Sequence, residues 1–258
     1  MNIVITGHLG FIGQNMVNAL SEEHDITVYE WGDFLPDLAN KDLCIHLGAI
    51  SSTTETDVDK ILDQNYDFSR WLLGACNYWG VPLQYASSAS VYGMVSSFAE
   101  DAPATPQSPY AWSKYLFERY ATKMRESGRI TVRTQGFRYF NVYGPHEDHK
   151  DQPSPYSRFE KQAKETGVIK LFEGSDKYLR DFVPVETVVN VHKKFFNVEE
   201  SGIWNIGTGR ATSFESVARM VADKYNATIE YIPMPENIQA QYQKYTCADV
   251  TKLRQYYP

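Results

Sequence analysis

Short apolar runs alternate with longer segments in which apolar residues recur at helical spacing along the first half of this chain. Runs of this kind predict strands, and the segments between them predict helices that cover a parallel sheet. The pattern therefore predicts an α/β fold built on a doubly wound parallel sheet of the Rossmann type. The expected strands are Ile3–Ile5, Ile26–Tyr29, Leu43–Leu47, Leu83–Ala86 and Thr131–Thr134, and the expected helices are Gly10–Glu22, Val58–Trp79 and Pro109–Glu126.

The segment between Tyr29 and Leu43 is short, with only 13 residues. A doubly wound sheet usually carries a helix, a strand and a second helix at this point, and 13 residues cannot hold all three. We therefore expect a sheet that is trimmed at one edge.

After about Val142 the pattern loosens, and the polar stretch His146–Ser154 predicts a loop over a site. We expect a dinucleotide-binding Rossmann domain formed by residues 1–142 and 185–206. Residues 143–184 and 207–258 would form a smaller, partly discontinuous α/β lobe for the substrate. Later elements are expected at Glu186–Phe196 (helix), Trp204–Ile206 (strand), Phe214–Tyr225 (helix, begun by Ser213) and Thr228–Ile232 (strand).

The composition is that of a globular protein, with 43% hydrophobic and 22% charged residues. A net charge of −7 argues against a surface that binds nucleic acid or an anionic membrane. The N-terminus lacks the pattern of a leader peptide, and no apolar run approaches the length of a membrane span. We expect a cytoplasmic protein. Its cysteines Cys44, Cys76 and Cys247 are odd in number and far apart in sequence, so we expect buried thiols rather than disulfides or a metal site.

A glycine motif follows the first predicted strand and opens the first predicted helix. It runs from Thr6 to Gly13 with glycines at Gly7, Gly10 and Gly13. Glycines at this point permit a tight turn and a close approach of the backbone to a pyrophosphate, and the helix N-terminus supplies free amides. The position of the motif predicts dinucleotide binding, and its GxxGxxG spacing favours the short-chain dehydrogenase/reductases.

An acidic residue, Glu30, ends the second predicted strand. A carboxylate there can accept hydrogen bonds from the adenosine ribose and would repel a 2′-phosphate. The sequence therefore favours NAD, with NADP as the alternative. The other interpretation of Glu30 is a solvated carboxylate at a strand end.

A tyrosine and a lysine, Tyr110 and Lys114, share one face of the helix that Ser108 and Pro109 are expected to begin. An ammonium group near a phenol can stabilise the phenolate and lower the tyrosine pKa. After a glycine motif, this pair predicts an acid/base catalyst. The serine-rich end of another predicted strand, Ser87–Tyr92, would lie where strand ends line the ligand crevice of such a sheet, and a hydroxyl there can bind a reacting oxygen.

The three motifs, in this order, resemble those of the extended short-chain dehydrogenase/reductases of the NAD-dependent epimerase/dehydratase family. Members of that family epimerise, dehydrate or reduce nucleotide sugars. A narrower resemblance, to the ADP-L-glycero-D-manno-heptose 6-epimerases, spans nearly the whole chain. It is carried by Ser51–Glu55, Phe137–Pro145, His149–Lys150, Leu171–Ser175, Leu179–Phe182 and Asn205–Arg210.

This resemblance implies roles for individual residues. Ser88, Tyr110 and Lys114 would be catalytic, and Lys150 would be a second acid/base. The residues expected to bind the ADP-sugar are Ser88, Asn141, Phe172, Glu173, Gly174, Ser175, Arg180 and Tyr242. The residues expected to bind the dinucleotide are Gly7, Gly10, Phe11, Ile12, Gly13, Glu30, Trp31, Leu47, Gly48, Ala49, Ser51, Asn65, Lys114 and Val142.

The implied reaction is epimerisation of a nucleotide-diphospho-sugar by transient hydride transfer to tightly bound NAD or NADP and return to the opposite face. The resemblance also implies a homo-oligomer. Other interpretations remain: Lys150 as a solvated loop lysine, and Arg180 with Asp181 as a surface ion pair. Competing functions are a 4-epimerase, a dehydratase, a reductase or a non-catalytic NAD-sensing protein. The dehydratase reaction requires an Asp-Glu pair after the strand-end hydroxyl, where this chain has Ala89 and Ser90.

Overall fold

The central element of the fold is a six-stranded parallel sheet. The computed structural model describes residues 1–34, 37–52, 55–147, 150, 152–235 and 243–258. The strands follow the order β2-β1-β3-β4-β5-β9, and every neighbouring pair is parallel. Their bounds are β1 (Asn2–Thr6), β2 (Asp25–Tyr29), β3 (Leu43–His46), β4 (Leu83–Ser88), β5 (Thr134–Tyr139) and β9 (Gly202–Ile206).

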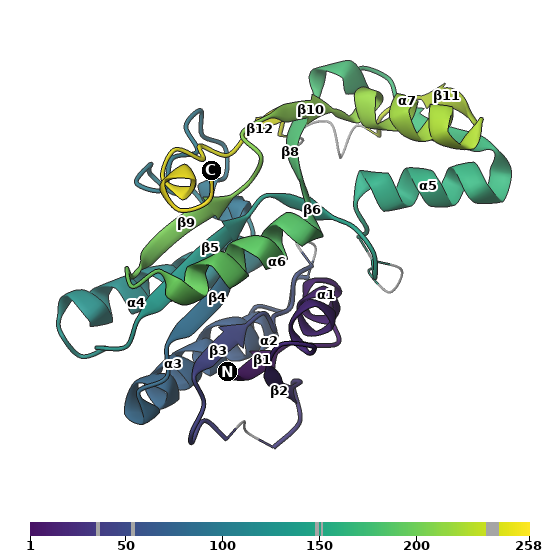
Figure 1. Cartoon of the computed structure of the whole chain (residues 1–258). Coiled ribbons are helices and arrows are strands. Elements are labelled where there is room, and N and C mark those ends of the chain that lie inside the picture. The colour runs from purple at the N-terminus through teal and green to yellow at the C-terminus, as the bar shows by residue number, and fades with distance from the viewer. Residues whose placement is uncertain (35–36, 53–54, 148–149, 151, 236–242) are drawn as a thin grey trace.

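Helices cover both faces of this sheet because its strands are apolar on both sides (Figure 1). On β1, Ile3 and Ile5 pack with α1 (Phe11–Leu20) and with Val189 of α6 (Val185–Lys194). Val4 points to the other face, as the two-residue period of a strand requires, and packs with α3 (Phe68–Trp79) and α4 (Pro109–Glu126). The α/β, doubly wound fold predicted from the sequence is confirmed.

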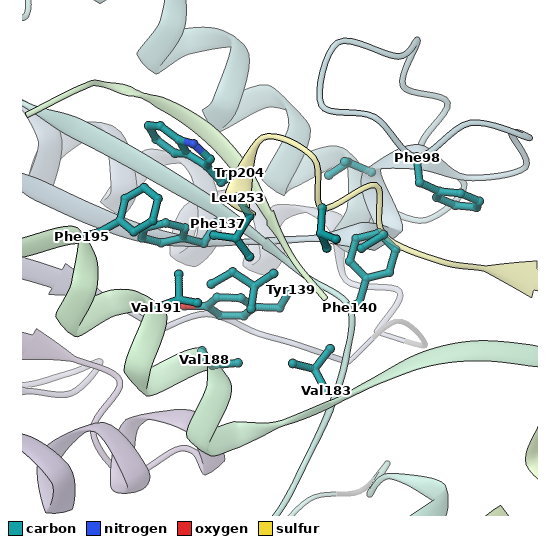
Figure 2. Packing of buried hydrophobic residues seen from close by; sticks show 14 of the residues in the cluster. Phe98, Phe137, Tyr139, Phe140, Val183, Val188, Val191, Phe195, Trp204 and Leu253 are labelled. Atoms are coloured by element: carbon teal, nitrogen blue, oxygen red, sulfur yellow. The ribbon is translucent and has the colours of Figure 1, made fainter. Parts of the chain in front are cut away.

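A third group of buried side chains lies along β5 and the edge strand β9. Figure 2 shows Phe137 and Trp204 packing with Phe195, which follows α6 in the short helix η4 (Phe195–Asn197). Leu253 of η5 (Leu253–Gln255) joins this cluster, so the last segment of the chain packs on the large sheet.

A smaller lobe has its own apolar cluster, beside the large sheet in Figure 1. The helices α5 (Pro155–Thr166) and α7 (Phe214–Tyr225) pack on the two-stranded parallel sheet of β7 (Val168–Phe172) and β11 (Thr228–Ile232). Strand β8 (Leu179–Pro184) pairs with three short strands, which are β6 (Asn141–Tyr143), β10 (Ala211–Ser213) and β12 (Tyr245–Thr246). The remaining short helix here is η3 (Ser175–Lys177).

One expected strand is shifted, one helix was not expected, and one expected helix is present over its full range with an irregular middle segment. The strand expected at Thr131–Thr134 begins only at Thr134, because Gln135 and Arg138, which look like loop residues, are buried with polar partners. The helix α5 was not expected. The helix expected at Val58–Trp79 consists of α2 (Val58–Ile61), a π-helical segment η1 (Leu62–Asp67) and α3. The trimmed edge is present, since β2 is an edge strand and the described part of residues 30–42 contains no helix or strand.

The cysteines fit the expectation of buried thiols in part. Cys44 and Cys76 are buried next to each other, and their hydrogen bond, followed by burial, raises the pKa of the Cys44 thiol. Cys247 is only half-buried. Among the described helices, none is long and apolar enough to cross a membrane.

Candidate active site

The glycine motif forms the turn between β1 and α1. Gly7 has φ +73°, and a Cβ atom there would lie 2.4 Å from the Cα of Gly48. A Cβ on Gly13 would lie 2.0 Å from the carbonyl oxygen of Gly7. Gly10 precedes the first turn of α1, whose amides receive no side-chain cap. The first turn of α1 therefore presents uncapped backbone N–H groups next to glycines that allow close approach, which fits a pyrophosphate.

Beside this turn lies a pocket of about 90 Å³. It brings together five of the residues expected to bind the dinucleotide, Gly7, Glu30, Trp31, Gly48 and Ala49. The other lining residues were not among those expected to bind the dinucleotide, although Thr6 begins the glycine motif; they are Thr6, Tyr29, Ile50, Gln64 and Phe68. Tyr29 could have been found as the neighbour of Glu30 at the strand end, whereas Gln64 and Phe68 reach the pocket only through the packing of η1 and α3.

The Glu30 carboxylate lies at the rim of this pocket and accepts a hydrogen bond from the Leu9 amide at 3.2 Å. The His8 ring lies 3.7 Å away. Among the described residues that line the pocket there is no lysine or arginine, and Lys41 instead donates to the Thr27 hydroxyl at 2.7 Å. A carboxylate in a pocket with this lining suits ribose hydroxyls and disfavours a 2′-phosphate, so the residues present fit NAD.

Asn65 holds the loop that follows β3. Its side-chain oxygen accepts from the Ile50 amide at 2.8 Å, and its side-chain nitrogen donates to the Ile50 carbonyl and to the Ser113 hydroxyl, both at 3.0 Å. Asn65 therefore shapes the cofactor loop through contacts within the protein. Leu47 lies in the same loop and packs against the core, and Ser51 is exposed and does not line the pocket.

Buried His46, at the end of β3, links three elements of the site. One ring nitrogen lies 2.6 Å from the Thr6 hydroxyl, next to the glycine turn, and the other lies 2.8 Å from the Ser69 hydroxyl on α3. Burial lowers the pKa of His46 to about 3, with a smaller contribution from Lys114. The ring is therefore neutral and serves as a fixed hydrogen-bonding bridge. Sequence analysis did not identify it.

The structure brings Ser88, Tyr110 and Lys114 together at the carboxyl end of β4. Ser108 caps α4 by accepting from the Ala111 amide at 3.2 Å, which places Tyr110 in the first helical turn. The Tyr110 hydroxyl shares a hydrogen bond with Ser88, and the Lys114 amine donates to the Ala86 carbonyl at 3.0 Å. The structure thus pairs the Ser88 and Tyr110 hydroxyls, with a buried amine one helical turn after Tyr110.

The pKa of Tyr110 corrects one expectation. Burial raises this pKa, and the hydrogen bond with Ser88 offsets only part of the rise, whereas we expected Lys114 to lower it. Burial also lowers the pKa of Lys114 to about 8, and the Glu118 carboxylate opposes this effect. Both groups therefore lie in a poorly hydrated environment, where an added positive charge acts strongly on a phenol.

Lys150 does not lie in a solvated loop. Its amine lies 4.9 Å from the centre of the Phe11 ring, at the start of α1, and burial lowers its pKa against the opposing charge of Glu147. Glu147 is itself buried and fixes this loop, because its carboxylate accepts from the Gly144 and Ser154 amides at 3.0 and 2.6 Å. Lys150 is thereby held beside the glycine motif.

Arg180 and Asp181 are neighbours on β8 and both are buried, so the alternative of a surface ion pair is wrong. Asp181 is fully buried and accepts from the amides of Thr208, Gly209 and Ala248 at 2.9 to 3.1 Å. The Arg180 guanidinium lies 5.5 Å from the centre of the Phe214 ring. Asp181 therefore holds the segments at Thr208 and Ala248 next to β8. No sequence motif indicated this role.

The other residues expected to bind the sugar nucleotide lie around β8. Asn141 donates to the Asp181 carbonyl at 3.3 Å, and its neighbour Val142 is half-buried against the large core. After β7, the turn Phe172–Ser175 is closed by the Ser175 hydroxyl, which donates to the Phe172 carbonyl at 2.6 Å. Glu173 and Gly174 are exposed at its tip. Tyr242 lies outside the described residues.

Comparison with known proteins agrees with this geometry. The family model described as "NAD dependent epimerase/dehydratase family" matches residues 3–207. The ADP-L-glycero-D-manno-heptose-6-epimerase of Brachyspira hyodysenteriae is 37% identical over an alignment of 287 residues that covers 98% of this chain and 90% of that protein.

Two solved structures have the same architecture. A UDP-N-acetylglucosamine 4-epimerase from Methanobrevibacter ruminantium superposes with a TM-score of 0.89 at 23% identity, covering 100% of this chain and 92% of the other. The Thermus thermophilus UDP-glucose 4-epimerase, solved with NAD, superposes with a TM-score of 0.84 at 25% identity, covering 100% of this chain and 94% of the other. The chain belongs to the NAD-dependent epimerase/dehydratase family.

Proposed function

We propose that this protein is a nucleotide-sugar epimerase whose substrate is ADP-glycero-manno-heptose, inverted at carbon 6. The observation that carries the proposal is the hydrogen-bonded pair of Ser88 and Tyr110, backed by Lys114, beside a glycine turn shaped for a dinucleotide. The substrate assignment comes from the relative that is 37% identical over nearly the whole chain.

Each group in the site has a separate task in this reaction. NAD, held by the glycine turn and by Glu30, would supply reversible hydride acceptance at the sugar carbon. Tyr110 takes the proton of the sugar hydroxyl as the hydride leaves, and the Ser88 hydroxyl holds the reacting oxygen. The buried Lys114 amine stabilises the phenolate form of Tyr110. The oxidised sugar would then rotate within the site, so that the hydride returns to the opposite face of the ketone carbon and inverts the centre. Lys150 or Tyr110 donates a proton to the same oxygen in this second step, and the reaction involves no net oxidation.

The residues after Ser88 favour epimerisation over dehydration. Elimination of water needs an additional carboxylic acid at this point. The short helix η2 (Ala89–Tyr92) instead starts with Ala89 and Ser90, and the Ser90 hydroxyl donates to the Ser88 oxygen at 2.9 Å. In this proposal Arg180 holds the diphosphate of the substrate, together with the turn Phe172–Ser175, because a guanidinium binds phosphate oxygens in a bidentate manner.

Three expectations complete the proposal. The dinucleotide-binding domain comprises residues 1–142 and 185–206, and the sugar-nucleotide lobe comprises the rest, except that the last segment from Ala248 packs on the large sheet. The protein works in the cytoplasm as a homo-oligomer. Size-exclusion chromatography with light scattering tests the oligomer, and a monomer at micromolar concentration would contradict it.

Incubation with ADP-D-glycero-D-manno-heptose, followed by chromatography of the two epimers, tests the function. We expect interconversion without added NAD, with nicotinamide cofactor released on denaturation. Tyr110→Phe should lower the rate at least about a hundredfold, whereas Tyr115→Phe, on the same helix and away from Ser88, should keep it. If the protein carries cofactor but does not convert the ADP-heptose, the substrate assignment would be refuted.

A further inference from the structure

A buried ion pair lies directly behind the catalytic strand end. Glu118 on α4 is 1% exposed and Arg138 on β5 is 4% exposed. The guanidinium donates to both carboxylate oxygens, from Nε at 2.9 Å and from Nη2 at 2.7 Å. Removing two charges from water is costly, so a pair in this place calls for an explanation other than stability alone.

The same carboxylate also binds the strand that ends in Ser88. The Ser87 hydroxyl donates to Glu118 Oε1 at 2.5 Å. Ser87 and Arg138 are directly opposite each other in the β4–β5 ladder, so Glu118 binds one residue from each of two adjacent strands. Because neighbouring residues of a strand point to opposite faces, fixing Ser87 toward α4 fixes Ser88 toward the crevice.

Glu118 lies one helical turn after Lys114. Lys114 binds the Ala86 carbonyl, and Glu118 binds Ser87, the next residue. The helix that carries Tyr110 is therefore attached to β4 at two consecutive positions, and the attachment sets the distance between Tyr110 and Ser88.

Every polar atom of the pair is used within the protein. The third nitrogen of Arg138 donates to the Glu100 carbonyl at 3.2 Å, and its guanidinium lies 4.7 Å from the centre of the Tyr92 ring. A cavity of about 700 Å³ is lined in part by Glu118 and Arg138, but neither Ser87 nor Lys114 lines it. Because each nitrogen of Arg138 and each carboxylate oxygen of Glu118 has a partner within the protein, we favour a role in holding the strand end over a role in ligand binding.

From this geometry we infer that Glu118, held by Arg138, is a positioning residue for the epimerisation, which orients Ser88 against Tyr110 and places a negative charge beside Lys114. The inference rests on the proposed function. The groups that face Lys114 are Glu118 on its own helix, His46 on β3 and the Ala86 carbonyl on β4, and Tyr110 lies one helical turn before it. His46 is neutral, so Glu118 supplies the negative charge among them.

The two effects can be separated by two variants. Glu118→Gln keeps the size and an acceptor for Ser87 but removes the charge. We expect the Lys114 titration, followed by NMR of ¹³C-lysine and assigned with Lys114→Arg, to shift to lower pH. The basic limb of the kcat–pH profile should shift with it, so that kcat falls about tenfold above pH 8. Ser87→Ala keeps the charge, and should lower kcat about tenfold at every pH with an unchanged Lys114 titration.

The controls distinguish this role from a structural one. Glu126→Gln, at the exposed end of α4, should change neither readout. If Glu118→Gln fails to fold because Arg138 is left unpaired, the double variant Glu118→Gln/Arg138→Met removes both charges and should show the same shift. A variant that is only less stable, with unchanged Lys114 titration and unchanged pH profile, would overturn the inference. Absence of heptose turnover in the unsubstituted protein would overturn the proposed function instead, because the lysine titration needs no substrate.

Discussion

The carbonyl oxygen of Gly7 occupies the place that a side chain on Gly13 would need, only 2.0 Å from the ideal Cβ position. The atom in contact is backbone, so it cannot rotate away, and α1 would have to move off β1. We expect Gly13→Ala to lower the free energy of unfolding by about 1–3 kcal/mol and to abolish retention of the cofactor. Urea denaturation and absorbance of the denatured supernatant measure the two effects.

Gly74→Ala is the matched control. Gly74 lies within α3, and nothing lies within 4 Å of the Cβ that alanine would add. This variant should be more stable by about 0.5–1 kcal/mol, because glycine inside a helix costs backbone entropy. If Gly13→Ala retained as much cofactor as Gly74→Ala, the Gly7 carbonyl would not be what excludes a side chain at position 13.

Cofactor selectivity should depend on the charge of Glu30. In Glu30→Gln the repulsion of a 2′-phosphate is lost while the side-chain size is kept, so the affinity ratio of NAD over NADP should fall about tenfold. Isothermal titration calorimetry of the cofactor-free protein measures both constants. Asp25→Asn, at the other end of β2, should leave the ratio unchanged. A ratio that is equal in both variants would mean that Glu30 does not select the cofactor.

Lys150 should be needed for inversion rather than for the first oxidation. Lys150→Ala should lower epimerisation by about a hundredfold or more, which is the typical contribution of an acid/base group. Reduced cofactor should still form on mixing with substrate and is followed by its absorbance, because Tyr110 takes the first proton. Lys161→Ala, exposed on α5, serves as the control. If Lys150→Ala lost both epimerisation and the formation of reduced cofactor, Lys150 would be needed for substrate binding rather than for inversion.

Stability should fall in mild acid because of two buried histidines. Burial lowers the pKa of His46 and of His192 to about 3, against 6.5 in the unfolded chain. The unfolded state therefore binds more protons below pH 6.5, and the stabilisation present above that pH is lost progressively as the pH falls toward 3. Each histidine should contribute about 1.4 kcal/mol per pH unit.

His192→Gln isolates one of these contributions. The imidazole lies 2.8 Å from Gln84 Oε1 and 2.6 Å from the Tyr139 hydroxyl, and an amide can bond to both. Urea titrations at pH 7, 6, 5 and 4 should give a slope that is smaller than in the unsubstituted protein by about 1.4 kcal/mol per pH unit. Identical slopes would show that His192 is protonated in the folded state.

Asp181 should be important for stability. It accepts three backbone N–H groups and the Thr208 hydroxyl, and Asp181→Asn would turn an NH₂ group toward some of these donors. We expect a loss of roughly 3 kcal/mol in unfolding free energy by urea denaturation. Asp176→Asn, exposed in η3, should change it by less than about 0.5 kcal/mol. Comparable losses in the two variants would contradict this role.

Local signals predicted much of the fold. The bounds of α4 and α7 follow from Ser108 and Ser213, which cap these helices as expected. The same signal, Ser154 followed by Pro155, starts α5, but we interpreted this proline-rich region as part of a loop. Strand β5 was placed three residues too early because its polar residues satisfy one another across the sheet. The Gln84–Gln135 hydrogen bond is an example, and local pattern cannot reveal it.

The candidate site was predictable where chemistry coincides with a local motif, as at Gly7, Glu30 and Tyr110. It was not predictable where a residue acts through distant partners. His46, Glu118 and Asp181 look like ordinary strand or helix residues, and their importance depends on contacts with residues 20 to 67 positions away. The direction of the Tyr110 pKa was missed for the same reason, since burial depends on the whole fold.

The loop after β6 has both of its ends joined by one side chain, because Glu147 binds the amides of Gly144 and Ser154. This anchorage depends on Glu147 and on two backbone amides, and not on the side chain of Lys150. During divergence, the chemical group at position 150 can therefore change while the two ends of the loop stay in place. The fold thus leaves room for a different second proton donor without any rebuilding of the sheet or of its helices.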